Sequence, residues 1–165
     1  MKELQFFNKK ALSTPGKGVF EEAFKRYQSY IEINKNKLPK NVVNIVKSDW
    51  YFNARDPRCP KDAWLIKQRL DNEYDVVIRE KKSAEYELTL LGAYHDCHLH
   101  FIYKSVYDIA VYGYGGSLIR KDYDPWRIDE FSIGDDGLLT HSIYFLSGNV
   151  WVIKCRDFDF RLTKI

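Results

Sequence analysis

The chain has 165 residues, of which 45% are hydrophobic and 30% are charged, a balance that excludes disordered, collagen-like and coiled-coil proteins. With 26 Lys and Arg against 23 Asp and Glu, its net charge is +3, and its more basic first part lacks the dense Lys/Arg run of a dedicated nucleic-acid-binding arm. We therefore expect no nucleic-acid partner, and nucleic-acid binding by the basic N-terminal part is the alternative. The length suits one domain with its own hydrophobic core, so we predict a single domain over residues 1–165.

Cysteine usage and apolar patterning bear on the compartment. Cys59, Cys97 and Cys155 form no Cys-x-x-Cys pair, which favours reduced thiols over a disulfide framework or a zinc knuckle. The N-terminus lacks the apolar stretch of a signal peptide, and no window approaches the roughly 18 apolar residues of a membrane span. We therefore expect a cytoplasmic protein that does not enter membranes.

The first part of the chain, residues 1–92, is predicted to be mainly helical. The apolar residues from Phe20 to Ile31 recur at spacings of four and three, which is typical of an amphipathic helix. Pro39 suits the first turn of a second helix, and Asp62 suits the N-cap of a third.

The segment 72–92 fits two descriptions. Its apolar spacing favours helices that Gly92 would end, whereas the β-branched run Val76-Val77-Ile78 fits a strand. We favour the helical interpretation.

After Gly92 apolar and polar residues alternate, which predicts short strands separated by tight turns at Asp136-Gly137 and Ser147-Gly148. Helices followed by strands indicate an α+β fold, in which the helical N-terminal half packs on an antiparallel β-meander over residues 93–165. This meander is either open or curled towards a barrel. The expected strands are His95–Tyr103, Tyr107–Tyr112, Leu118–Lys121, Arg127–Ile133, Leu138–Leu146 and Asn149–Arg156.

Three of the four histidines fall within His95–His100, and on a strand Asp96, His98 and His100 would share one face. A His-x-His pair spaces two imidazoles for a shared divalent first-row metal, with Asp96 or His141 as a further ligand. This pattern supports one hypothesis, a metal-dependent enzyme or sensor built on His98, His100 and His141. In the competing interpretation the histidines belong to the polar face of the sheet and the protein has no cofactor.

No complete catalytic set is visible. Asp129-Glu130 stands out among the acidic residues, because it lies between Ile128 and Phe131 in a predicted strand. One of the two carboxylates must therefore point towards the covered face of the sheet. Cys97 next to a histidine is a weak candidate nucleophile, because adjacent residues on a strand point apart.

Phe, Trp and Tyr make up 16% of the chain, and most of them follow helical or strand periodicity, which places them in the core. The others lie in irregular segments. Tyr and Trp combine a large contact area with a polar group and are enriched at interfaces. We predict that this set lines a groove or surface that binds a protein partner: Trp50, Tyr51, Phe52, Tyr112, Tyr114, Tyr123 and Trp126.

The second half also contains a series of four short motifs. They are Trp126-Arg127-Ile128-Asp129-Glu130-Phe131, Asp136-Gly137 followed by His141-Ser142-Ile143, Ser147-Gly148, and the closing Asp157-Phe158-Asp159-Phe160. This pattern resembles the C-terminal strands of small bacterial proteins of unknown function, in which a His-Asp pair, here His95-Asp96, opens the sheet. Some of those proteins are thought to be immunity proteins that neutralise toxins. The resemblance implies a non-catalytic immunity or accessory factor that binds a protein, and it assigns no role to His98 or His100.

Overall fold

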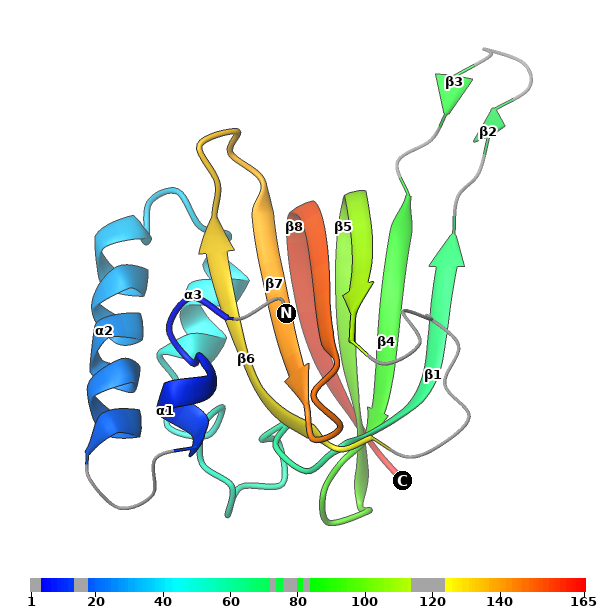
Figure 1. Cartoon of the computed structure of the whole chain (residues 1–165). Coiled ribbons are helices and arrows are strands. Elements are labelled where there is room, and N and C mark those ends of the chain that lie inside the picture. The colour runs from blue at the N-terminus through cyan, green and yellow to red at the C-terminus, as the bar shows by residue number, and fades with distance from the viewer. Residues whose placement is uncertain (1–3, 14–17, 72–73, 76–79, 82–83, 114–123) are drawn as a thin grey trace.

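A computed structural model describes residues 4–13, 18–71, 74–75, 80–81, 84–113 and 124–165 (Figure 1). The helices in this part of the chain are α1 (Lys9–Ser13), α2 (Val19–Asn34) and α3 (Lys40–Val46). The strands are β1 (Trp64–Asp71), β2 (Tyr74–Asp75), β3 (Glu80–Lys81), β4 (Glu85–Leu91), β5 (Cys97–Tyr112), β6 (Trp126–Ile133), β7 (Leu139–Phe145) and β8 (Val150–Lys164).

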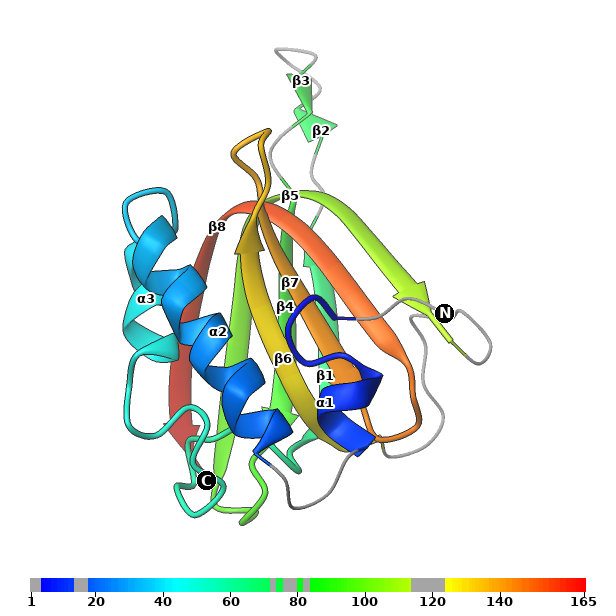
Figure 2. The same ribbon diagram turned by 60° about the vertical axis from the view of Figure 1, so that its left-hand side comes forward.

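Six of the described strands form one antiparallel sheet in the order β1-β4-β5-β8-β7-β6, and β2 pairs with β3 separately. The long strands β5 and β8 pair over almost their whole length. On one side of this central pair, β4 lies beside β5 and β1 lies beside β4. On the other side, β7 lies beside β8 and β6 lies beside β7. The pairing shifts between Val106 and Asp108, next to the positive φ of 51° at Ser105, and both long strands curve across the molecule (Figure 2).

The sheet is open, with β1 and β6 as its two edge strands. At one end the edges meet through an isolated bridge between Trp64 and Pro125. There the Asp62 N–H donates to the Trp126 carbonyl at 2.7 Å, and the Trp126 N–H donates to the Ala63 carbonyl at 3.0 Å. The sheet therefore curls at this end without closing into a barrel.

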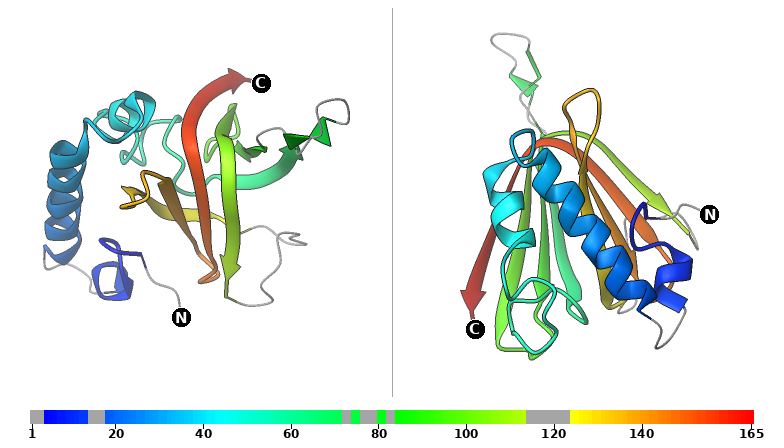
Figure 3. Two further views of the ribbon diagram at one scale, coloured as in Figure 1. Left: turned by 90° about the horizontal axis from the view of Figure 1, so that it is seen from above. Right: turned by 90° about the vertical axis from the view of Figure 1, so that its left-hand side faces the viewer.

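The helices lie on one side of the sheet (Figure 3). α2 buries Ala23, Tyr27 and Ile31 on a single stripe, and α3 buries Val42 and Val46. The helices predicted around residues 20–31 and after Pro39 are thus confirmed. Their buried stripes pack on the aromatic side chains of the sheet's covered face, which form the core of the molecule.

α2 also protects the exposed edge of β6. The hydroxyl of Tyr27 accepts a hydrogen bond from the Phe131 N–H at 2.6 Å, and that of Tyr30 accepts one from the Ile133 N–H at 2.9 Å. Unpaired N–H groups on an edge strand invite pairing with other chains. Two tyrosines on successive turns of α2 satisfy these groups without a further strand.

The predicted division into a helical half and a sheet half is wrong. Residues 64–71 and 85–91, which we expected to be helical, are the paired strands β1 and β4. In β4 Tyr86, Leu88 and Leu90 are buried on the core face, whereas Glu85, Glu87 and Leu91 on the other face are only partly buried. Asp62 caps no helix and instead has a φ of 65°. Val76-Val77-Ile78 lie outside the described residues.

The predicted β-meander is wrong for the same reason. β5 pairs with β4 and β8 rather than with the next described long strand, β6, and the sheet includes strands from both halves of the chain. β5 is one strand where two were expected, and β8 continues to Lys164. The expected strand at 118–121 lies outside the described residues. The two predicted turns are confirmed, with φ values of 75° at Gly137 and 91° at Gly148.

Candidate functional site

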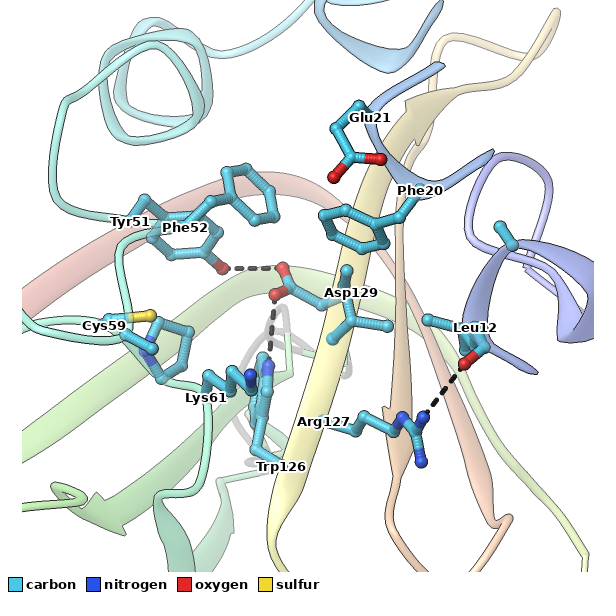
Figure 4. Close-up of a pocket in the computed structure, with 14 residues that line it drawn as sticks. Leu12, Phe20, Glu21, Tyr51, Phe52, Cys59, Lys61, Trp126, Arg127 and Asp129 are labelled. Atoms are coloured by element: carbon cyan, nitrogen blue, oxygen red, sulfur yellow. Dashed lines mark hydrogen bonds between the residues drawn. The ribbon is translucent and has the colours of Figure 1, made fainter. Parts of the chain in front are cut away.

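Asp129 is the centre of a buried polar network (Figure 4). Its side chain points from β6 into the covered face of the sheet, as predicted for one member of the Asp129-Glu130 pair, and the residue is only 1% exposed. Oδ2 accepts hydrogen bonds from the Tyr51 hydroxyl at 2.6 Å and from His141 Nε2 at 2.7 Å. Oδ1 accepts one from Trp126 Nε1 at 3.1 Å. Three donors therefore hold this carboxylate in place.

His141 links Asp129 to the interior of the sheet. Because a carboxylate only accepts, we assign the imidazole proton to Nε2, which leaves Nδ1 to accept from the Tyr103 hydroxyl at 2.7 Å. The ring is fully buried and stacks on Phe131 with centroids 3.8 Å apart. Burial lowers the pKa of His141, and the hydrogen bond to Asp129 opposes this shift only in part. The hydrogen bonds are therefore all donated in one direction: the Tyr103 hydroxyl donates to a neutral His141, and His141 donates to Asp129.

Tyr51 stays a donor in this network. Burial raises its pKa well above 10, and the nearby negative charge of Asp129 raises it further. A buried tyrosine hydroxyl that keeps its proton can always donate a hydrogen bond to the carboxylate. The hydrogen bonds of this network therefore hold its side chains in fixed positions, as a preformed binding surface requires.

A cavity of about 420 Å³ opens above Asp129 between α1, the start of α2, the loop 51–61 and β6. Phe20, Phe52 and Trp126 supply aromatic walls, and Lys61 and Arg127 contribute positive charge (Figure 4). The guanidinium of Arg127 donates to the Leu12 carbonyl at 3.2 Å and so ties β6 to the end of α1. Cys59 also lines the cavity, where burial raises the pKa of its thiol to about 11.

Three of the predicted partner-binding aromatics, Tyr51, Phe52 and Trp126, meet at this cavity. Tyr51 and Trp126 are nevertheless almost fully buried, so they line its inside rather than an open surface. Trp50 is half-buried, with its ring 5.3 Å from that of Phe160. Tyr112 is exposed at the end of β5, which β8 and β7 separate from β6. Tyr114 and Tyr123 lie outside the described residues.

The structure does not bring the three predicted metal-ligating histidines together. His98 and His100 lie on the outer face of β5, whereas His141 is buried on the covered face. Both ring nitrogens of His100 have partners, since Nδ1 lies 2.9 Å from Glu87 Oε1 and Nε2 lies 2.9 Å from Thr163 Oγ1. Among the described residues, no three His, Cys, Asp or Glu side chains are arranged to hold a metal ion.

Cys97 does not face the neighbouring histidines either. Its side chain is buried on the side of β5 opposite to His98, and burial raises the pKa of its thiol to about 11. The strand alternation predicted for His95–His100 is confirmed from Cys97 onward, where β5 begins. A thiol and an imidazole on opposite faces of one strand cannot act as nucleophile and base.

Sequence reasoning missed the partners of Asp129 and His141. Tyr103 lies 38 residues before His141, and Tyr51 lies 78 residues before Asp129. The acidic pair inside an apolar strand was a usable signal for a buried carboxylate. Nothing in the local sequence indicates which distant side chains approach it.

No family model, curated protein or solved structure matches the chain. The resemblance to immunity proteins accordingly stays a prediction. Within the described residues, no helix combines the length and the apolar character needed to cross a bilayer.

Proposed function

We propose that the chain is a non-catalytic, cytoplasmic protein-binding factor of the immunity or accessory class. Its binding site would be the cavity above Asp129. The observation that carries this proposal is the set of three internal hydrogen bonds that this carboxylate accepts from Tyr51, Trp126 and His141. A carboxylate with three internal donors is preorganised as part of a cavity wall and poorly placed to take a proton from a substrate.

The walls of the cavity favour an aromatic side chain of the partner. Its volume lies within the roughly 300–1,000 Å³ range of ligand pockets, which is room for a side chain together with adjoining backbone. Phe20 is 38% exposed, so it can contact an incoming ring, and Phe52 and Trp126 flank the same space. Aromatic pairs add about 0.5–1.5 kcal/mol beyond the area that they bury.

The charges favour a neighbouring acidic residue on the partner. Lys61 is exposed and has no ion pair within the described part of the chain, and it lies with Arg127 on one side of the cavity, whereas the acidic Glu21 lies on the opposite side (Figure 4). Charge complementarity at such a rim speeds association and selects the orientation of the partner. The proposed ligand is thus an aromatic residue followed by Asp or Glu.

The thiol in the cavity supports a binding role as well. Cys59 has a pKa of about 11, so it is protonated at neutral pH, whereas nucleophilic cysteines need a thiolate. The cavity therefore offers a ligand van der Waals contacts and charge interactions, and its thiol is not an activated nucleophile.

An NMR titration of ¹⁵N-labelled protein with the capped dipeptide acetyl-Phe-Asp-amide tests the proposal. We expect amide shifts at Phe20, Phe52 and Lys61, and smaller shifts with acetyl-Phe-Lys-amide or acetyl-Ala-Asp-amide. Ala54→Trp should block the cavity, because Ala54 is an exposed residue of its lining. Lys61→Ala should weaken binding, whereas the matched control Lys40→Ala, on α3, should not.

Equal shifts with the lysine and the aspartate peptides, or shifts confined to another surface, would overturn the assignment of this cavity. The immunity class has its own test. The product of a toxin gene adjacent to this one should form a stoichiometric complex that Ala54→Trp weakens. A gene neighbourhood without such a toxin counts against that class.

A further inference from the structure

The outer face of the sheet carries a second cavity, of about 350 Å³, away from the helices. Four residues form a row across β1, β4, β5 and β8, where each is the register partner of the next: Lys67, Thr89, His100 and Arg161. Neighbouring strands lie about 4.8 Å apart. The two long cationic side chains therefore stand on the flanking strands, with Thr89 and His100 as the floor between them.

Glu87 organises this floor. Its carboxylate and the imidazole of His100 are each only 12% exposed, and they lie 2.9 Å apart. Thr163 holds the other ring nitrogen at 2.9 Å, so the imidazole is fixed from both sides. Burial alone would raise the pKa of Glu87, but the hydrogen bond from His100 and the charges of Arg161 and Arg69 outweigh it, and the pKa is lowered.

Among the described residues, two of the three cations that line the cavity, Lys67 and Arg161, keep donors available for a ligand. The Nη2 atom of Arg161 lies 3.8 Å from Glu87 Oε1, an ion-pair distance that is too long for a hydrogen bond. Arg69 is already engaged, because its Nη2 donates to the other Glu87 oxygen at 3.4 Å. Its guanidinium also pairs with Asp71 at 3.3 Å and with Glu85 at 3.8 Å. Lys67 lines the cavity and has no ion pair within the described part of the chain. Lys67 and Arg161 thus keep donors available, and both side chains line the same cavity.

The surroundings limit what this positive charge can bind. The next rows of the same face carry Asp71 and Glu85, which pair with Arg69, and Asp159, so the positive charge does not extend beyond the cavity on this side. Within the described residues, no Phe, Tyr or Trp lines it, so it offers no platform for stacking nucleobases. These features fit one compact anion better than a polyanionic strand.

We propose that this cavity binds a single phosphate group, with Lys67 and Arg161 as its charged donors and Thr89 at its base. Charge-assisted hydrogen bonds from guanidinium and ammonium groups to phosphate are the strong contacts that such a site needs. The group comes either from free phosphate or from a phosphomonoester. This site lies on the other face of the sheet and does not depend on the proposed protein-binding function.

NMR titrations of the ¹⁵N-labelled chain at constant ionic strength test the proposal with three probes: inorganic phosphate, O-phosphoserine and single-stranded deca-thymidylate. We expect saturable amide shifts at Lys67, Thr89 and Arg161 with at least one of the first two probes. Tighter binding of O-phosphoserine assigns a phosphomonoester, and otherwise free phosphate is the ligand. Arg161→Gln combined with Lys67→Gln should weaken binding about tenfold or more, because two charge-assisted contacts are lost. Both side chains are accessible to solvent, so the fold should survive.

Lys104→Gln is the matched control, because this exposed lysine lies on the same face but outside the cavity. The proposal is overturned if neither phosphate probe gives saturable shifts here, or if Lys104→Gln weakens binding as much as Arg161→Gln combined with Lys67→Gln does. Preferential binding of deca-thymidylate, with a salt dependence of several phosphate contacts, would also overturn it and would assign a nucleic-acid surface instead.

Discussion

His141 Nε2 lies 2.7 Å from Asp129 Oδ2 in a pair that solvent does not reach. A buried carboxylate is costly unless hydrogen bonds compensate for the loss of water, and Tyr51 and Trp126 provide two more. The pair joins β6 to β7, and its hydrogen bonds reach the loop that carries Tyr51 and the long strand β5 through Tyr103. It therefore connects the cavity wall to the centre of the sheet.

Asp129→Asn should destabilise the protein strongly. The amide has one acceptor oxygen for three donors, and its own NH₂ group would face Tyr51, Trp126 or His141. Each buried donor that is left unsatisfied in this way costs about 1–3 kcal/mol. Urea denaturation measures the change through its midpoint at an unchanged m-value. Tyr51→Phe removes one donor and keeps the ring, so it should cost less, about 1–2 kcal/mol. Equal stability of Asp129→Asn and the wild type would contradict the role given to this carboxylate.

The pH dependence of stability should show the neutral state of His141. Its pKa in the folded protein lies below the ordinary value of 6.5, because burial disfavours the charged ring. The unfolded chain therefore binds a proton at this residue before the folded chain does. Stability should fall as the pH drops below about 6.5, by up to 1.4 kcal/mol per pH unit from this group.

Two-dimensional NMR of the imidazole nitrogens checks this directly. The His141 ring should keep its proton on Nε2 at a pH where model histidines are charged. The exposed His95 serves as the internal comparison, since its ring lies at the surface next to Trp64. A charged His141 at pH 6 would show that the proposed direction of the network is incorrect.

Glu130 should control the docking of the N-terminal segment. Its carboxylate accepts the backbone N–H groups of Gln5, Phe6 at 2.8 Å and Phe7 at 3.3 Å. A glutamine offers one acceptor oxygen, so Glu130→Gln leaves part of this set unpaired. We expect faster hydrogen exchange at these three amides, with little change in α3. Asp135→Asn, in the exposed turn between β6 and β7, is the control and should leave their exchange unchanged.

The protonation of Glu130 gives a second readout. Burial raises its pKa above the ordinary value of 4.5, although the backbone N–H groups oppose this shift. The folded chain therefore binds the proton more readily than the unfolded chain. The stability contributed by this group is present below pH 4.5 and is lost as the pH rises through the raised folded pKa. Glu130→Gln should remove this component from the stability profile between pH 4 and neutrality.

Tyr27→Phe should expose the edge of β6. The variant keeps the buried ring but deletes the acceptor that lies 2.6 Å from the Phe131 N–H. An unsatisfied buried N–H group costs about 1–3 kcal/mol, so the thermal midpoint should fall. Tyr30→Phe should cost less, because Tyr30 is only half-buried. A larger loss with Tyr30→Phe than with Tyr27→Phe would contradict this account.

The local patterns of the chain determined several features without a structure. The stripe from Phe20 to Ile31 predicted α2, and the glycines at 137 and 148 predicted the turns that flank β7. Alternation placed His98 and His100 on one face of a strand, and the apolar neighbours of Asp129 marked a buried carboxylate. Each of these features depends only on residues that are close in the sequence, so the sequence alone predicts it.

Tertiary pairing decided the rest. Residues 64–71 and 85–91 become strands because they pair with each other and with β5, and these backbone hydrogen bonds override a weak helical spacing. The same packing buries Tyr51 and Trp126, which line the inside of the cavity rather than an open surface, and it separates His141 from the other histidines. The periodicity of apolar residues shows that one face of a helix or strand is buried, but it does not show which distant segment packs on that face. The cavity above Asp129 and the cationic row on the outer face exist only once those segments meet.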